Sequence, residues 1–147
     1  MKKPSFLICI ASAIALTACG SDNQVDTNPL CDDDDVIELV DEIVKDEAKS
    51  QLFEVMLKKA GKSGEITYQQ AVDVAGRSAE LDGVIALVNE TIDQQQLIYS
   101  NISMSEQDLD QHKVWCSAGM GAEGKKPAII NYTALHTAED VEVYVTF

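Results

Sequence analysis

Histidine, basic residues and long apolar runs are all scarce in this sequence. It has 2 histidines, and 11 lysines and arginines stand against 25 aspartates and glutamates. This balance excludes nucleic-acid binding, because phosphate groups repel a strongly acidic surface. Neither His112 nor His136 has a partner at metal-ligand spacing, and the chain contains no G-x-S-x-G nucleophile motif. We therefore predict neither a metal centre nor an enzyme.

The N-terminal apolar run is short. It covers Phe6–Leu16, is interrupted only by Ser12, and follows the positively charged Lys2 and Lys3. A helix needs about 20 apolar residues to span a bilayer, so this stretch is too short for a permanent anchor. A short apolar run behind a basic start is typical of a secretory signal peptide. We therefore expect the protein to be exported.

The apolar run ends in Leu16-Thr17-Ala18-Cys19, an apolar residue, two small residues and a cysteine. This tetrapeptide resembles the lipobox of bacterial lipoproteins. The resemblance implies cleavage before Cys19, a diacylglycerol on its sulfur and a further acyl chain, and two or three chains hold a protein firmly on a membrane. The next residue is Gly20, not the aspartate that retains such proteins at the inner membrane. The resemblance therefore implies the periplasmic face of the outer membrane.

The domain organisation follows from these signals. Residues 20–30 are polar, lack periodicity and contain a proline, which is typical of a linker. We predict a signal peptide over residues 1–18, a lipid anchor and flexible tether over residues 19–30, and a single domain over residues 31–147. The remaining length is ordinary for one domain.

Two cysteines remain once the signal peptide and the lipidated residue are set aside. They are Cys31 and Cys116, and two thiols in an oxidising compartment most simply form one disulfide. A redox pair or a metal site is the alternative, but the spacing fits neither and no other thiol is left. We predict a structural disulfide that ties the start of the first helix to the second strand.

Helical periodicity dominates the first half of the predicted domain. Apolar residues recur at three- and four-residue steps over residues 37–55, which predicts a long helix with one buried stripe. The stripe consists of Ile37, Val40, Val44, Ala48, Leu52 and Val55. Residues 77–96 show the same periodicity. Between these helices, Thr67 is suited to cap a short helix over residues 67–76.

The second half of the predicted domain changes to strand-like composition. Four segments are rich in β-branched and aromatic residues, and loops separate them. They cover residues 97–104, 113–120, 127–135 and 141–147. Helices followed by consecutive strands predict an α+β fold, in which the helices pack on one face of an antiparallel β-meander of about four strands.

Trp115 is the only tryptophan in the chain. It lies between Val114 and Cys116 in the second predicted strand and alternates out of phase with both. We interpret it as a core residue that packs under the helices. The alternative is a hot spot for binding, a role in which tryptophan is enriched.

One motif suggests a nucleotide site. Gly119, Gly121 and Gly124 form G-x-G-x-x-G, the pattern of a dinucleotide-binding loop. Such a loop needs a helix after it, whose N-terminus meets the pyrophosphate, whereas Pro127 and a strand-like segment follow here. We interpret the glycines as the connection of a β-hairpin, and we expect no nucleotide and no cofactor.

Negative charge is the feature left to assign. All 25 acidic residues but only 9 of the 11 basic ones follow Cys19, so the processed chain has a net charge of −16. We interpret Asp32–Asp35 as the start of the first helix rather than as a divalent-cation site.

A further acidic group lies off the predicted stripe of that helix. It consists of Asp41, Glu42, Asp46 and Glu47. We expect these residues to form an exposed partner-binding surface, which speeds the approach of a cationic protein. Solubility alone is the simpler interpretation of the same charge.

These signals together predict a binding protein. We expect a lipid-anchored envelope lipoprotein that acts by non-catalytic protein binding, as an accessory or assembly factor. The alternative is an inhibitor or exclusion factor that binds a cationic lytic enzyme, toxin or phage protein.

Overall fold

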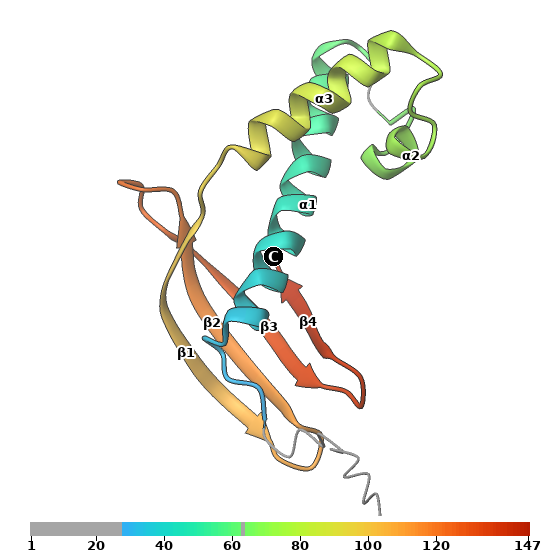
Figure 1. Cartoon of the computed structure of the whole chain (residues 1–147). Helices are drawn as coiled ribbons and strands as arrows, with labels where there is room; N and C mark the ends of the chain where they lie inside the picture. The colour runs from blue at the N-terminus through green and yellow to red at the C-terminus, as the bar shows by residue number, and fades with distance from the viewer. Residues whose placement is uncertain (1–27, 63) are drawn as a thin grey trace, which may run out of the picture.

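The computed structural model describes residues 28–62 and 64–147 (Figure 1). Within them, helices come first and strands follow. The elements are α1 Asp34–Lys59, α2 Tyr68–Asp73, α3 Ala79–Asp93, β1 Ile98–Asp108, β2 Lys113–Gly121, β3 Ala128–His136 and β4 Val141–Thr146. The predicted α+β fold is confirmed. The predicted signal peptide, Cys19 and most of the predicted tether lie outside the described residues.

The strands form one sheet in the order β1-β2-β3-β4, and each neighbouring pair is antiparallel. The meander arises because antiparallel neighbours need only short turns between them. β1 is irregular, with register shifts between Ser100 and Ser103 and between Met104 and Glu106, and Asn101 has a φ of 52°. Such bulges make an edge strand a poor template for pairing with another chain.

One face of the sheet packs against the first half of α1. Its side chains alternate along the strands, so that Val114 pairs with Ala134 and Cys116 with Tyr132 on the same face. We call the buried cluster on this face the sheet core. It contains Cys31, Val36, Val40, Val44, Val114, Cys116, Ala118, Ile130, Tyr132 and Ala134. The valines of β4 pack against its edge, as their alternation in the sequence predicts.

The second half of α1 packs against α2 and α3 at the other end of the molecule (Figure 1). We call this end the helical lobe. Its buried residues are Phe53, Leu57, Ala71, Ile85 and Val88. The rings of Phe53 and Tyr68 meet edge to face, with centroids 5.7 Å apart. α2 begins with a capping box, in which Thr67 and Gln70 each accept a hydrogen bond from the other's backbone N–H. The predicted cap at Thr67 is confirmed.

The prediction of a single buried stripe on α1 is wrong. At about 100° per residue, Phe53 and Leu57 lie roughly 120° around the helix from the α1 valines of the sheet core. Val55, which was expected to be buried, is 47% exposed. The reason is that α1 contributes to two cores on different sides of itself, so its apolar residues cannot follow one line.

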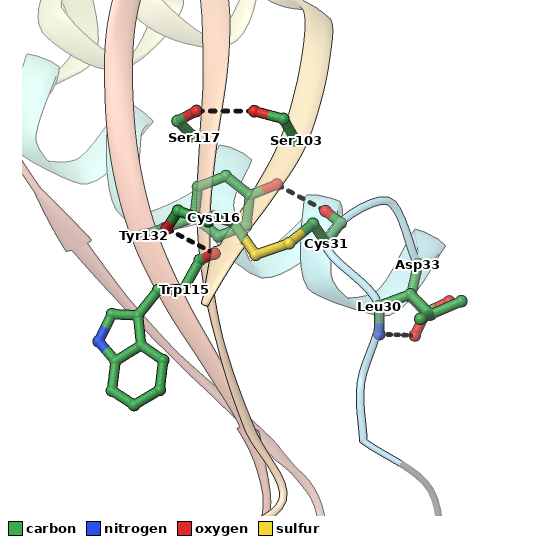
Figure 2. The surroundings of a disulfide bond; sticks show 9 residues. Leu30, Cys31, Asp33, Ser103, Trp115, Cys116, Ser117 and Tyr132 are labelled. Carbon is green, nitrogen blue, oxygen red and sulfur yellow. Dashed lines mark hydrogen bonds between the residues drawn. A yellow bond between two sulfur atoms is a disulfide. The ribbon is translucent and has the colours of Figure 1, made fainter. Parts of the chain in front are cut away.

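The predicted disulfide joins Cys31 to Cys116, with Cα atoms 5.7 Å apart (Figure 2). Beside it, the Tyr132 hydroxyl donates a hydrogen bond to the Cys31 carbonyl at 2.5 Å, and burial raises the pKa of Tyr132 to about 12. The Asn28 side chain also donates to the Asp108 carbonyl at 3.4 Å. The segment that leads into α1 is therefore fixed to the sheet covalently and by hydrogen bonds.

Candidate binding surfaces

Three of the four carboxylates of the predicted acidic surface line a groove beside α1. We call it the acidic groove; its volume is about 510 Å³. It is lined by Glu38, Asp41, Glu42, Lys45, Asp46, Lys49 and Asp93. Glu38 lies one helical turn before Glu42, so helical spacing could have identified it. Asp93 comes from the end of α3, and only the tertiary structure brings it here. The fourth predicted residue, Glu47, points into a different pocket.

Part of the charge in the acidic groove is neutralised within the protein. Lys45 Nζ lies 2.7 Å from a carboxylate oxygen of Asp41, and Lys49 Nζ lies 2.9 Å from one of Asp93. The hydrogen bond to Asp93 raises the pKa of Lys49, which keeps the lysine charged. Glu42 is exposed and forms no ion pair with a lysine in the part of the chain that the structure describes.

Asp41 also has a structural role. Its carboxylate accepts a hydrogen bond from the Tyr99 hydroxyl at 3.1 Å, and its side chain is only 28% exposed. Burial, together with the Asp41 charge, raises the pKa of Tyr99 well above its usual range, so the hydroxyl stays protonated and can donate. Asp41 thus holds α1 against β1, whereas Glu42 and Asp46 are exposed to solvent.

A second surface lies on the sheet face that points away from α1, which we call the open face. Trp115, Thr133 and Tyr144 are paired neighbours on β2, β3 and β4 and form a row across it. Tyr144 is 58% exposed and Ile129, on β3, is 79% exposed. The ammonium of Lys113 lies 4.7 Å from the centroid of the Trp115 ring. The open face therefore presents aromatic and aliphatic groups to solvent.

The interpretation of Trp115 as a core residue is wrong. Figure 2 shows its indole ring on the opposite side of β2 from the disulfide. Val114 and Cys116 are 1% and 2% exposed, whereas Trp115 is half-buried. Side chains alternate along a strand, so a tryptophan between two core residues must face outward. Once Val114 and Cys116 are assigned to the core, alternation along the strand is enough to predict that Trp115 faces outward.

The glycine motif belongs to a hairpin, but its three glycines have different roles. Gly124 lies in the turn between β2 and β3 with a φ of 72°, as a hairpin connection predicts. Gly119 and Gly121 lie within β2, which corrects the expectation that all three form the connection. A Cβ atom at Gly119 would come within 3.2 Å of the Ser100 Oγ and 3.3 Å of the Pro127 Cβ. Residue 119 is therefore a glycine because neighbouring residues leave little room for a side chain there.

Metal-binding side chains do not converge anywhere in residues 28–62 and 64–147, since no group of three or more His, Cys, Asp or Glu is placed to hold an ion. His112 has a φ of 49° and a buried Nδ1 without a hydrogen-bond partner among the described residues. None of the described helices combines the length and the apolar character needed to cross a bilayer.

Comparisons of the chain with family models, with curated proteins and with solved structures find no match. The two surfaces and the sequence signals are therefore the basis for a functional proposal. Cys19 and the signal peptide lie outside the described residues, and lipidation stays a prediction from the lipobox.

Proposed function

We propose that this protein is a lipid-anchored envelope lipoprotein that acts by non-catalytic protein binding, as an accessory or assembly factor. The observation that carries the proposal is the open face, where Trp115 and Tyr144 flank Thr133 in one row. Exposed apolar patches with a polar surround are typical of interaction sites. Tryptophan and tyrosine are also the residues that contribute most to binding energy at interfaces.

The build of the open face favours a protein partner over a small ligand. It is part of a regular sheet in which β2, β3 and β4 are paired along their length, so the backbone that carries its side chains is held in a fixed arrangement. Ile129 extends the apolar area beyond the aromatic row, and Lys113 lies at its rim. Apolar anchors on a rigid, polar-rimmed surface match the usual anatomy of a protein interface.

A crosslinking pull-down from native membranes tests the proposal, with the full-length protein as bait. We expect the wild type to capture a specific envelope protein and a variant with Trp115→Ala and Tyr144→Ala to capture at least about tenfold less, since anchor residues each contribute about 2 kcal/mol or more. The matched control changes two exposed apolar residues of the helical part, Val55→Ala and Leu87→Ala. Equal capture by all three proteins would place the interface elsewhere.

The lipid anchor is tested separately, since it depends on the lipobox alone. Radiolabelled palmitate should enter the wild type and should not enter Cys19→Ser. Label that persists in this variant would move the anchor to another residue and would remove the argument for the outer membrane.

The acidic groove favours the alternative function, an inhibitor or exclusion factor that binds a cationic lytic enzyme, toxin or phage protein. Five carboxylates face two lysines in this groove, and the processed chain carries a net charge of −16. Such a field raises the rate of association with a basic protein. The Debye length falls from about 10 Å at 0.1 M salt to about 3 Å at 1 M, so this steering should fade over that range.

Charge reversal in the acidic groove distinguishes steering from solubility. The informative variant changes Glu38, Glu42 and Asp46 to lysine and spares Asp41, because Asp41 binds Tyr99 and Lys45. The control makes the same charge change on the strand side of the molecule, at exposed acidic positions outside the groove. We expect a slower association rate and a weaker salt dependence for the groove variant only. Identical rates for both would make the charge a solubility feature.

A further inference from the structure

A second pocket lies on a different side of α1, between α1 and α2. Its volume is about 460 Å³, which is within the range of pockets that bind small ligands or single side chains. Phe53, Leu57, Ile66 and Tyr68 supply an apolar floor. The Tyr68 hydroxyl already donates a hydrogen bond to Asn89, so the ring is held in place. We call this site the α1–α2 pocket.

The rim of the α1–α2 pocket is acidic, and its charge is uncompensated. Glu47 and Glu54 of α1 line it, and no lysine or arginine of residues 28–62 and 64–147 does. Glu47 accepts a hydrogen bond from the neutral amide of Gln51 at 2.9 Å. Neither glutamate forms an ion pair with any residue of the described part of the chain. In the acidic groove, by contrast, two carboxylates are paired with lysines.

The geometry of the two glutamates excludes a metal ion as the ligand. They are seven residues apart, so they lie on the same side of α1 with their Cα atoms separated by roughly 10 Å along the axis. A calcium ion needs six or more oxygen ligands at 2.3–2.6 Å, and two carboxylates this far apart over an apolar floor cannot supply them. An anion is excluded by the sign of the charge.

We propose that the α1–α2 pocket receives a lysine or arginine side chain of a basic partner. The aliphatic stem of that side chain packs on the floor, and its charged end lies beside Glu47 or Glu54. Long cationic side chains bury their stems in this way while the charge stays near water. The proposal rests on the proposed binding function and names a cationic anchor that this function uses.

Nuclear magnetic resonance titration of the full-length protein in detergent micelles tests the pocket directly. The probes are acetylated and amidated Ala-Arg-Ala and Ala-Lys-Ala, at physiological salt. The side-chain amides of Gln51, Gln69 and Gln70 line the pocket and serve as reporters. We expect saturable shifts of these signals. The same peptide with norleucine in the centre, which has the stem without the charge, should shift them far less.

Two double variants with equal charge change separate binding in this pocket from attraction by the general negative charge of the protein. Glu47→Gln with Glu54→Gln should weaken the two cationic peptides roughly 3- to 10-fold, because it removes one direct charge contact and the longer-range attraction of the second carboxylate. Asp110→Asn with Glu123→Gln, at exposed positions that line neither the pocket nor the groove, should leave their affinity within about a factor of two. A spectrum with unchanged dispersion shows that each variant is folded.

Several outcomes would overturn the pocket proposal. They are the absence of saturable shifts at millimolar peptide, equal weakening by both double variants, and equal binding of the norleucine peptide. Failure of the binding function is seen separately, in the membrane pull-down. If Glu47→Gln with Glu54→Gln captures the envelope partner as well as the wild type does, the binding function stands and the pocket proposal fails.

Discussion

The sheet core and the helical lobe are stabilised by different means. The sheet core is built largely from small side chains, namely valine, alanine and cysteine. Such residues bury little apolar area each, and here the Cys31–Cys116 disulfide adds a covalent tie between β2 and the segment that leads into α1. The helical lobe has no disulfide among the described residues and depends on larger side chains, with Phe53 at its centre.

The two halves also differ in the binding surface that each presents to a partner. The open face lies on the back of the covalently tied half, where a fixed arrangement of Trp115 and Tyr144 favours a specific interface. The α1–α2 pocket lies in the half without a covalent tie. There the short α2 is held by the contacts of Tyr68 with Phe53 and Asn89. The helical lobe is therefore held together by noncovalent contacts, whereas the sheet half also has a covalent tie.

Removing the disulfide should have the largest effect on stability. Replacing Cys31 and Cys116 by alanine reopens a loop of 85 residues, which costs at most about 4.6 kcal/mol of unfolding free energy in the chain-entropy model. Urea denaturation measures this loss. Hydrogen exchange should show that the amides of the sheet lose more protection than those of α3. Equal losses in both halves would mean that the two cores unfold as one unit.

Phe53→Ala should destabilise the helical lobe by about 3 kcal/mol, at the low end for such a change because the side chain borders the α1–α2 pocket and the site can relax. The loss should appear as faster exchange of the α3 amides, with the sheet amides less affected. Val55→Ala, on the same helix but 47% exposed, is the control and should cost less than about 0.5 kcal/mol. Similar costs for the two substitutions would refute the two-core description of α1.

Tyr132→Phe removes the hydrogen bond to the Cys31 carbonyl and should cost about 1 kcal/mol at neutral pH. Folding raises the pKa of this hydroxyl from 10.0 to about 12, so the unfolded state releases the proton first. Its contribution is therefore complete below pH 10 and is lost as the pH rises toward 12. Denaturation at a series of pH values should show a smaller alkaline loss in Tyr132→Phe. A loss as steep as in the wild type would assign the effect to other tyrosines.

Ile129→Thr should have the smallest effect on stability, below about 0.5 kcal/mol, because the side chain is 79% exposed. Threonine keeps the β-branched shape that suits a strand. Capture of the membrane partner should nevertheless fall if the open face is the interface. Thermal melting and the pull-down, performed on the same preparation, provide the two measurements. A clear loss of stability without a loss of capture would assign Ile129 a structural role.

Much of the architecture could be predicted because its causes are local. Alternation of valines in residues 141–145 requires only neighbouring residues, and so does the capping box that begins with Thr67. The Cys31–Cys116 pair could be predicted by elimination, since the remaining thiols were assigned to the signal peptide and the lipid anchor. The outward direction of Trp115 could also have been predicted, because the residues on either side of it are core residues, although we interpreted Trp115 as core.

The order of the elements could be predicted from local patterns, because hydrogen bonding along a helix and alternation along a strand act over a few residues. The first strand, expected to end at residue 104, continues to Asp108, where it pairs with β2. The tertiary structure decided which sides of α1 are buried, since α2, α3 and the sheet meet that helix from different directions. It also brought Asp93, at the end of α3, beside Lys49 of α1, and it placed Ile66 and Tyr68 beside Phe53. These relations depend on residues far apart in the chain, and no local pattern records them.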